Sequence, residues 1–108
     1  VRGARIDGEE AAAWRLAGRA VQAQDVLPLA LEIAADMVQN CSPLVMGMHK
    51  RLLWRGLDME RDELVALETR ALHHSMRQPD ALEGGMAYVE KRAPRWDAHH
   101  AARWPEFL

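Results

Sequence analysis

A single cysteine and the absence of any long apolar run limit what this chain can be. Cys41 is the only cysteine among 108 residues, so no disulfide can form within the chain, and a reducing compartment suits it. No run of about 18 apolar residues is present, which excludes a membrane-spanning helix. The start of the chain lacks the basic segment followed by an apolar stretch that marks a secretory signal. We therefore expect a cytoplasmic protein with no membrane partner.

An excess of charge of either sign is also missing. The 14 basic and 16 acidic residues leave a formal net charge of -2, which gives no reason to expect a nucleic-acid partner. The composition is 49% hydrophobic and 28% charged, close to that of soluble globular proteins. Because small domains bury proportionally little surface, a single domain of this length should have marginal stability by itself.

The spacings typical of metal sites are absent as well. His73 and His74 are adjacent, as are His99 and His100, and neighbours on a helix point about 100° apart. No His-x-x-x-His or Cys-x-x-Cys spacing occurs, so surface histidines are favoured over metal ligands. Cys41 has no basic partner nearby in the sequence, which favours an inert thiol over a nucleophile. We expect neither a metal nor a resident cofactor.

What the sequence does have is helix signals along most of its length. Asp7 and Glu10 have capping-box spacing, and so do Asp80 and Glu83. Ser42 followed by proline is a hydroxyl cap with proline at the first helical position. The fold class is therefore all-α, with about five helices. We expect these at residues 8–14, 26–40, 43–56, 59–76 and 80–93.

Apolar residues recur at helical spacing in four of these segments, and each stripe should face a core. The stripes are Val26, Ala30, Ile33, Ala34 and Met37; Val45, Met48 and Leu52; Leu64, Leu67 and Ala71; and Leu82, Met86 and Val89.

The end of the chain differs from the rest. Residues 95–108 are rich in Arg, His and Trp without clear periodicity, so we expect a helical domain over 1–94 and a tail that orders mainly against partners. Trp54, Trp96 and Trp104 are hard to bury in so small a domain, and we expect them to be buried between subunits.

Three blocks of residues suggest a family. The first contains Gly3, Arg5, Glu9, Glu10, Ala11, Trp14 and Leu16; the second is Ser42-Pro43-Leu44 with Lys50; the third contains Glu68, Ser75 and the run from Asp80 to Trp96. In this order they resemble the C-terminal region of the enoyl-CoA hydratase/isomerase (crotonase) superfamily. Two positions depart from the family pattern: Arg15 stands where glycine usually follows the tryptophan, and Arg2 where a small residue is common. The arginine at position 15 puts the turn of the first segment in doubt.

The resemblance implies a protein that acts on a coenzyme A thioester. The family's catalytic core is a spiral of ββα turns that supplies two backbone N–H groups as an oxyanion hole, and hydratases add two glutamates. These groups lie upstream of the first matching block, and no acidic residue of this chain matches them. We therefore assign no catalytic residue and expect the chain alone, without the ββα core, to be inactive. The longer protein to which this chain would belong, its parent, would be a lyase or isomerase. This sequence does not identify the reaction of the parent or the length of the acyl chain of its substrate, because one fold supports several chemistries.

The family's C-terminal helices cover the acyl pocket and build trimers that pair into hexamers. The resemblance thus implies a homo-oligomeric parent, and a dimer of the isolated piece is possible. The family's aromatic-x-x-Lys motif lies by the CoA nucleotide and corresponds to Tyr88 and Lys91, where a ring can stack on adenine and an ammonium can meet phosphate. Three residues apart on a helix, they would share one face.

Other interpretations of the same residues stay open at this point. Tyr88 and Lys91 could be a half-buried ring and a solvated lysine. Arg92 and Arg95 could add positive potential near the nucleotide or be rim charges. The whole chain could also be a free-standing all-α module that associates with itself through its apolar faces.

Overall fold

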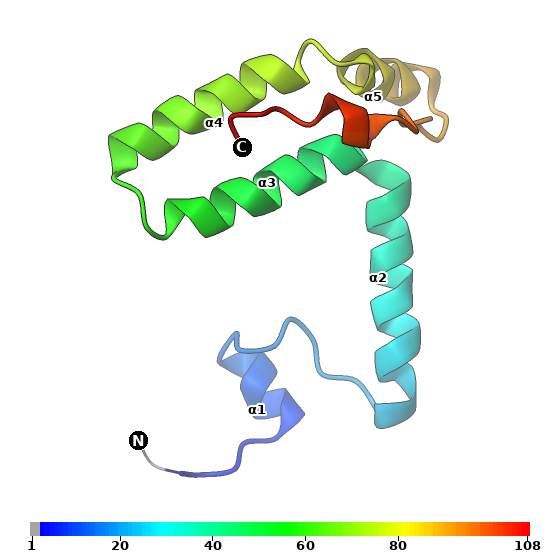
Figure 1. Cartoon of the computed structure of the whole chain (residues 1–108). Helices are drawn as coiled ribbons and strands as arrows, with labels where there is room; N and C mark the ends of the chain where they lie inside the picture. The colour runs from blue at the N-terminus through cyan, green and yellow to red at the C-terminus, as the bar shows by residue number, and fades with distance from the viewer. Residues whose placement is uncertain (1–2) are drawn as a thin grey trace. The chain divides into compact units, whose positions relative to one another are not determined.

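A computed structural model describes residues 3–108, and within this range the chain is all-α with no strand. The expectation of five helices is confirmed, and two short 3-10 helices, η1 and η2, accompany them (Figure 1). None of the described helices has the length and apolarity needed to cross a bilayer. The elements are α1 (Gly8–Ala13), η1 (Ala23–Asp25), α2 (Val26–Asn40), α3 (Pro43–Gly56), α4 (Arg61–Ser75), α5 (Pro79–Glu90) and η2 (His100–Arg103).

Two of the predicted N-caps are present. Asp7 Oδ1 accepts a 2.8 Å hydrogen bond from the Glu10 N–H and caps α1. Ser42 Oγ accepts a hydrogen bond of 3.5 Å from the Val45 N–H and caps α3, with Pro43 at the first helical position. Each side-chain oxygen satisfies one of the N–H groups that a helix start leaves without a partner.

The capping box predicted for α5 is wrong. Gln78 is the N-cap and Pro79 takes the first helical position, so Asp80 already lies inside the first turn. A residue inside the helix cannot cap it, because a cap needs non-helical backbone angles. The Asp80 carboxylate instead accepts a hydrogen bond from Ser42, and Glu83 pairs with Arg92.

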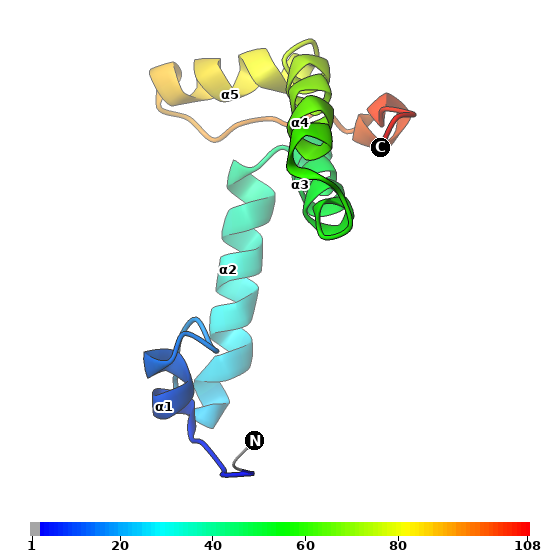
Figure 2. The same ribbon diagram turned by 90° about the vertical axis from the view of Figure 1, so that its left-hand side faces the viewer.

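The described chain divides into two compact units, Val1–Ala35 and Asp36–Leu108. In the second unit α3 and α4 lie side by side, and α5 extends away from them in Figure 2. Their facing sides hold the core, where the stripes predicted for both helices are largely confirmed. The buried cluster is Leu44, Met48, Leu52, Leu67 and Ala71, with Met59, Leu64, Phe107 and Leu108 packed against it.

The C-terminal tail packs on α3 and α4. Phe107 stands under the guanidinium of Arg70, with 4.3 Å from its Cζ atom to the ring centroid, and the Phe107 carbonyl accepts a hydrogen bond from Arg55. The Trp104 ring covers Gly47, where an added Cβ would come within 2.9 Å of the ring. From its composition we expect the tail to order mainly against partners, whereas these contacts are with its own unit. Further contacts with a partner stay a prediction, as does a boundary at residue 94.

The apolar stripes expected to face inward on α2 and α5 lie at the surface. No residue of α2 is buried, and Leu31 is 60% exposed. On α5, Leu82 and Val89 are 70% and 78% exposed. The inward orientation predicted for these two stripes is therefore wrong for this chain, because no other described element covers them. Trp54, at 66% exposed, is likewise uncovered.

In the first unit, α1 ends in a turn that carries the arginine which departs from the family pattern. Arg15 has a φ of 60°, in the left-handed region that favours glycine. The Arg15 N–H donates to the Ala12 carbonyl at 3.0 Å and the Leu16 N–H to the Ala11 carbonyl at 2.9 Å, the two hydrogen bonds of a Schellman motif. The turn therefore forms with arginine, in the conformation for which glycine is the usual residue.

Candidate functional site

The C-terminal end of α5 carries both residues predicted to contact coenzyme A. Tyr88 lies in the last turn, and its side chain is 86% exposed, so the half-buried ring considered from the sequence is wrong. Lys91 follows the helix as its C-cap, with φ 53° and ψ 42°. Because Lys91 is left-handed, the helical spacing that predicted a shared face with Tyr88 does not extend to it. Both side chains are at the surface.

The backbone reverses direction at Lys91. The Arg92 N–H donates to the Ala87 carbonyl at 3.1 Å, and the Lys91 N–H donates to the Tyr88 carbonyl at 3.4 Å. These are again the hydrogen bonds of a Schellman motif, which usually has glycine at the left-handed position. A lysine in that conformation costs roughly 1 kcal/mol, so the surrounding contacts must stabilise the turn.

An ion pair closes this turn. The Arg92 guanidinium donates to both oxygens of Glu83, with Nη1–Oε1 at 2.5 Å and Nη2–Oε2 at 3.0 Å. Its Nε atom donates to Glu90 at 2.6 Å, and the Arg95 N–H donates to Glu83 Oε1 at 2.6 Å. The hydrogen bonds from Arg92 and then from the Arg95 backbone lower the pKa of Glu83 to about 2. The same contacts raise the pKa of Arg92.

These contacts decide between the two interpretations of Arg92. Its charge is shared between the carboxylates of Glu83 and Glu90, so Arg92 holds the turn together rather than adding a net positive charge. Arg95 takes part through its backbone N–H, and its side chain stays exposed. The Lys91 ammonium is an exposed cation that directly follows the helix bearing Tyr88.

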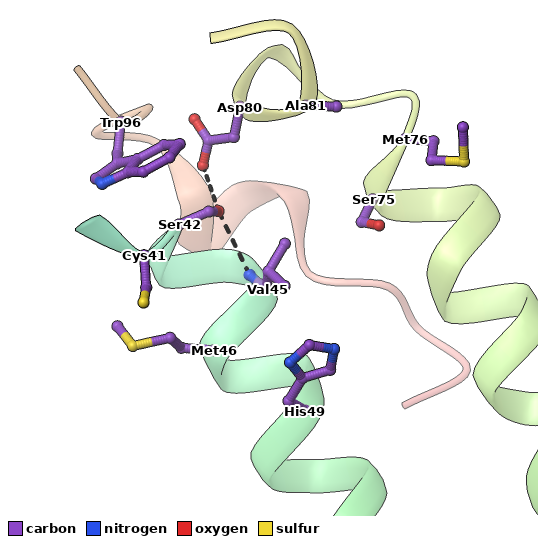
Figure 3. A pocket seen from close by; sticks show the side chains of 10 residues that line it. All are labelled: Cys41, Ser42, Val45, Met46, His49, Ser75, Met76, Asp80, Ala81 and Trp96. Carbon is purple, nitrogen blue, oxygen red and sulfur yellow. Dashed lines mark hydrogen bonds between the residues drawn. The ribbon is translucent and has the colours of Figure 1, made fainter. Parts of the chain in front are cut away.

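A pocket of about 340 Å³ lies in the second unit, between the start of α3, the end of α4 and the start of α5 (Figure 3). Its lining is mainly apolar and includes Cys41, Met46 and Met76. The Asp80 carboxylate reaches its wall, where Oδ2 accepts from Ser42 Oγ at 2.5 Å and Oδ1 accepts from the backbone N–H of residue 97 at 2.7 Å. Both carboxylate oxygens are thus used for folding.

The histidines and the remaining acidic groups are engaged in the fold or lie scattered. Within residues 3–108, no three His, Cys, Asp or Glu side chains are placed to hold a metal ion. His74 Nε2 lies 2.8 Å from the Arg103 carbonyl. Asp97 accepts from the His99 backbone and from the Arg103 side chain, and these two contacts lower its pKa. His74 thus holds the tail on α4, and Asp97 links residues within the tail.

Comparison with known proteins assigns the chain to a family. A family model described as enoyl-CoA hydratase/isomerase matches residues 1–99. The chain belongs to the enoyl-CoA hydratase/isomerase family. A carnitinyl-CoA dehydratase from Proteus mirabilis is 32% identical over 102 residues, which cover 87% of this chain and 37% of that protein. A carnitinyl-CoA dehydratase from Salmonella arizonae is 34% identical over 101 residues, which cover 90% of this chain and 38% of that protein.

Solved structures of this family agree with the assignment. The crystal structure of a probable enoyl-CoA hydratase/isomerase from Mycobacterium abscessus matches with a TM-score of 0.83 and 36% identity, over 88% of this chain and 38% of that one. The resemblance found in the sequence is thereby confirmed. The chain spans little more than a third of the length of the curated relatives that it matches, 37% in the case of the Proteus mirabilis protein.

Two side-chain links in the second unit were not found from the sequence. Glu83 and Arg92 are nine positions apart, beyond the spacing of three or four that joins side chains along a helix. Only the reversal at Lys91 brings them together. Ser42 and Asp80 are 38 positions apart and meet because α3 and α5 start at the same place.

Proposed function

We propose that this chain is the C-terminal helical region of a protein that acts on a coenzyme A thioester. In this proposal it covers the acyl-CoA site, contributes to a homo-oligomer and supplies no catalytic residue. The observation that carries the proposal is the match to the enoyl-CoA hydratase/isomerase family over residues 1–99. The alignment with a carnitinyl-CoA dehydratase, which covers 87% of this chain, covers only 37% of that protein. The catalytic groups of the family resemblance lie in a part that this sequence does not contain.

The uncovered apolar faces support the covering and assembly roles. Leu31 on α2 and Leu82 and Val89 on α5 are each 60% or more exposed. An apolar helix face that is exposed on a small protein usually marks an interaction site, and each of the two units carries one. We propose that the missing core covers part of this surface and that neighbouring subunits, as a trimer or a pair of trimers, cover the rest.

The end of α5 supports a role in binding the nucleotide of coenzyme A. The exposed Tyr88 ring can stack on adenine, and the Lys91 ammonium can pair with a phosphate. A phosphate of the nucleotide would neutralise the positive charge of the Lys91 ammonium, which is exposed to solvent. We place the working protein in the cytoplasm, in keeping with its single cysteine, Cys41.

The first experiment is the intact mass of the protein purified from its source cell. This chain weighs 12.2 kDa, and we expect a clearly larger mass, because the proposal places a catalytic core before these helices. A mass near 12.2 kDa would instead favour a free-standing all-α module that associates with itself.

Activity and binding then test the rest of the proposal. The native-length protein should hydrate or isomerise a short enoyl-CoA, whereas the 108-residue chain should not. Tyr88→Ala and Lys91→Met should each raise the Kd for coenzyme A about tenfold in the native-length protein, which corresponds to roughly 1.4 kcal/mol. Hydration by the 108-residue chain alone would contradict the absence of catalytic residues.

A further inference from the structure

We propose that Glu83 is a positioning residue that holds Lys91 in place for a phosphate of coenzyme A, acting through Arg92. The inference rests on the proposed function, because it takes the Lys91 ammonium as the group that meets the nucleotide. The residues involved form one loop, which leaves α5, turns at Lys91 and returns to Glu83.

The loop is closed at two points by the same carboxylate. Glu83 Oε1 and Oε2 receive the Arg92 guanidinium at 2.5 and 3.0 Å, and Oε1 also receives the Arg95 N–H at 2.6 Å. The side chain of Glu83 is half-buried, at 20% exposure, and that of Arg92 is 31% exposed. A two-pronged arginine–carboxylate contact fixes orientation as well as distance, which a single contact would not do.

Lys91 sits at the apex of this loop in an unfavourable backbone conformation. Its left-handed φ of 53° is one that a lysine adopts only when its surroundings enforce it. Arg92, the next residue, and Arg95, four positions after Lys91, supply that constraint through Glu83. Without it, the end of α5 would sample other conformations, and a phosphate would have to order the segment on binding.

The charges of the loop support the same assignment. Glu83 and Glu90 compensate Arg92. Within residues 3–108, no ion pair involves Lys91, so its ammonium is available to a ligand. The two basic residues therefore have different roles. Arg92 holds the backbone turn through Glu83, and Lys91 leaves its ammonium exposed to a ligand.

A double-mutant cycle in the native-length protein tests this division, with Kd for coenzyme A from calorimetry and with kcat and KM for a short enoyl-CoA. Glu83→Gln keeps the shape of the side chain and removes its charge. We expect it to raise Kd and KM about threefold to tenfold with kcat unchanged, since it acts on binding alone. In a Lys91→Met background the same change should have no further effect, because the cation that it positions is absent.

Glu90→Gln is the matched control. It also removes one carboxylate from Arg92, but it leaves the link from Glu83 to Arg95 intact, and its Kd should stay within about twofold of the wild type. If Glu83→Gln fails to fold, Arg92→Lys serves instead, because it keeps the charge and loses the two-pronged contact.

The outcomes separate the two proposals. If Glu83→Gln raised the Kd for coenzyme A by the same factor in the wild-type and in the Lys91→Met background, its effect would be a general one on α5. This result would overturn the positioning role. An unchanged Kd in Glu83→Gln beside a raised Kd in Lys91→Met would overturn it too, and would leave the proposed function standing. An unchanged Kd in Lys91→Met would overturn the nucleotide contact itself, and the positioning role with it.

Discussion

Ser42 Oγ donates a 2.5 Å hydrogen bond to Asp80 Oδ2 and so joins the N-cap of α3 to the first turn of α5. Both side chains are buried, at 9% and 7% exposure. The same hydroxyl accepts from the Val45 N–H, and the other oxygen of Asp80 accepts from the Asp97 N–H. One buried hydroxyl and one buried carboxylate thus tie together two helices and the start of the tail.

Ser42→Ala should destabilise the second unit by about 1 to 3 kcal/mol. The change removes the cap of α3 and leaves one oxygen of the buried Asp80 without its donor, and each loss has a cost. Urea unfolding of the purified chain, followed by tryptophan fluorescence, measures it. Ser75→Ala is the control, because that hydroxyl donates only to the Leu72 carbonyl of its own helix. Equal effects of the two substitutions would contradict a special role for the Ser42–Asp80 link.

Gly47→Ala should loosen the tail from α3. The added Cβ would lie 2.9 Å from the Trp104 ring, closer than two carbon atoms can approach, so the indole must move. We expect overpacking to cost about 1 to 3 kcal/mol, of which the better helix propensity of alanine offsets about 0.5 to 1 kcal/mol. Tryptophan emission should also change.

Gly85→Ala is the matched control for that substitution. Gly85 is also helical, and an added Cβ there has nothing within 4 Å. Alanine should therefore stabilise α5 by about 0.5 to 1 kcal/mol, the usual difference between the two residues in a helix. If Gly47→Ala gained as much stability as Gly85→Ala, the added Cβ would meet no obstacle, which would contradict the contact of Trp104 with α3.

Local signals in the sequence predicted the helices but not the contacts between them. The Asp7 and Ser42 caps and the stripe of Met48 and Leu52 are confirmed, because a cap and a helix face depend on residues three or four apart. The stripe on α5 was also a correct helical pattern, yet Leu82 and Val89 face solvent here. Periodicity identifies an apolar face without saying what covers it.

The candidate site was predicted only through the family resemblance. Tyr88 and Lys91 match a motif, but nothing in their spacing shows that the chain reverses between them. A lysine gives no sign of a left-handed conformation, which a glycine would have given. The link from Glu83 to Arg92 depends on that reversal, so no rule based on helical spacing could have found it.

The stability of the wild type should fall more steeply in acid than that of Glu83→Gln. The pKa of Glu83 is lowered from 4.5 to about 2 in the folded chain. Above about pH 4.5 the carboxylate is charged in both states, and its stabilisation is fully present. As the pH falls from about 4.5 to about 2, the unfolded chain binds the proton first, so the stabilisation declines and is lost below about pH 2.

Melting temperatures of both proteins across this pH range measure the effect. The difference between wild type and Glu83→Gln should be largest near neutral pH and should vanish in strong acid. Glu106→Gln, which removes an exposed carboxylate from the same unit, controls for the change in net charge. A difference that stayed constant with pH would contradict the lowered pKa of Glu83.

Arg15→Gly should stabilise the end of α1. Arg15 has a φ of 60°, and glycine adopts this conformation without the contact between Cβ and the backbone. The gain is partly offset, because glycine also gives the unfolded chain more freedom, and about 0.5 to 1 kcal/mol should remain. Hydrogen exchange of the Leu16 amide, which donates to the Ala11 carbonyl at 2.9 Å, reports on this turn. Its exchange should slow about twofold to fivefold.

Arg19→Gly is the matched control, because it also replaces an exposed arginine in the same unit. Of the residues other than glycine in the described range, only Arg15 and Lys91 have a positive φ, so glycine at position 19 relieves no strain. There the added freedom of the unfolded chain acts alone, and exchange of the Leu16 amide should stay the same or become faster. If both variants slowed exchange equally, the loss of a positive charge would be the cause. If only Arg15→Gly slows it, the difference between the two variants measures the cost of a left-handed arginine at this turn.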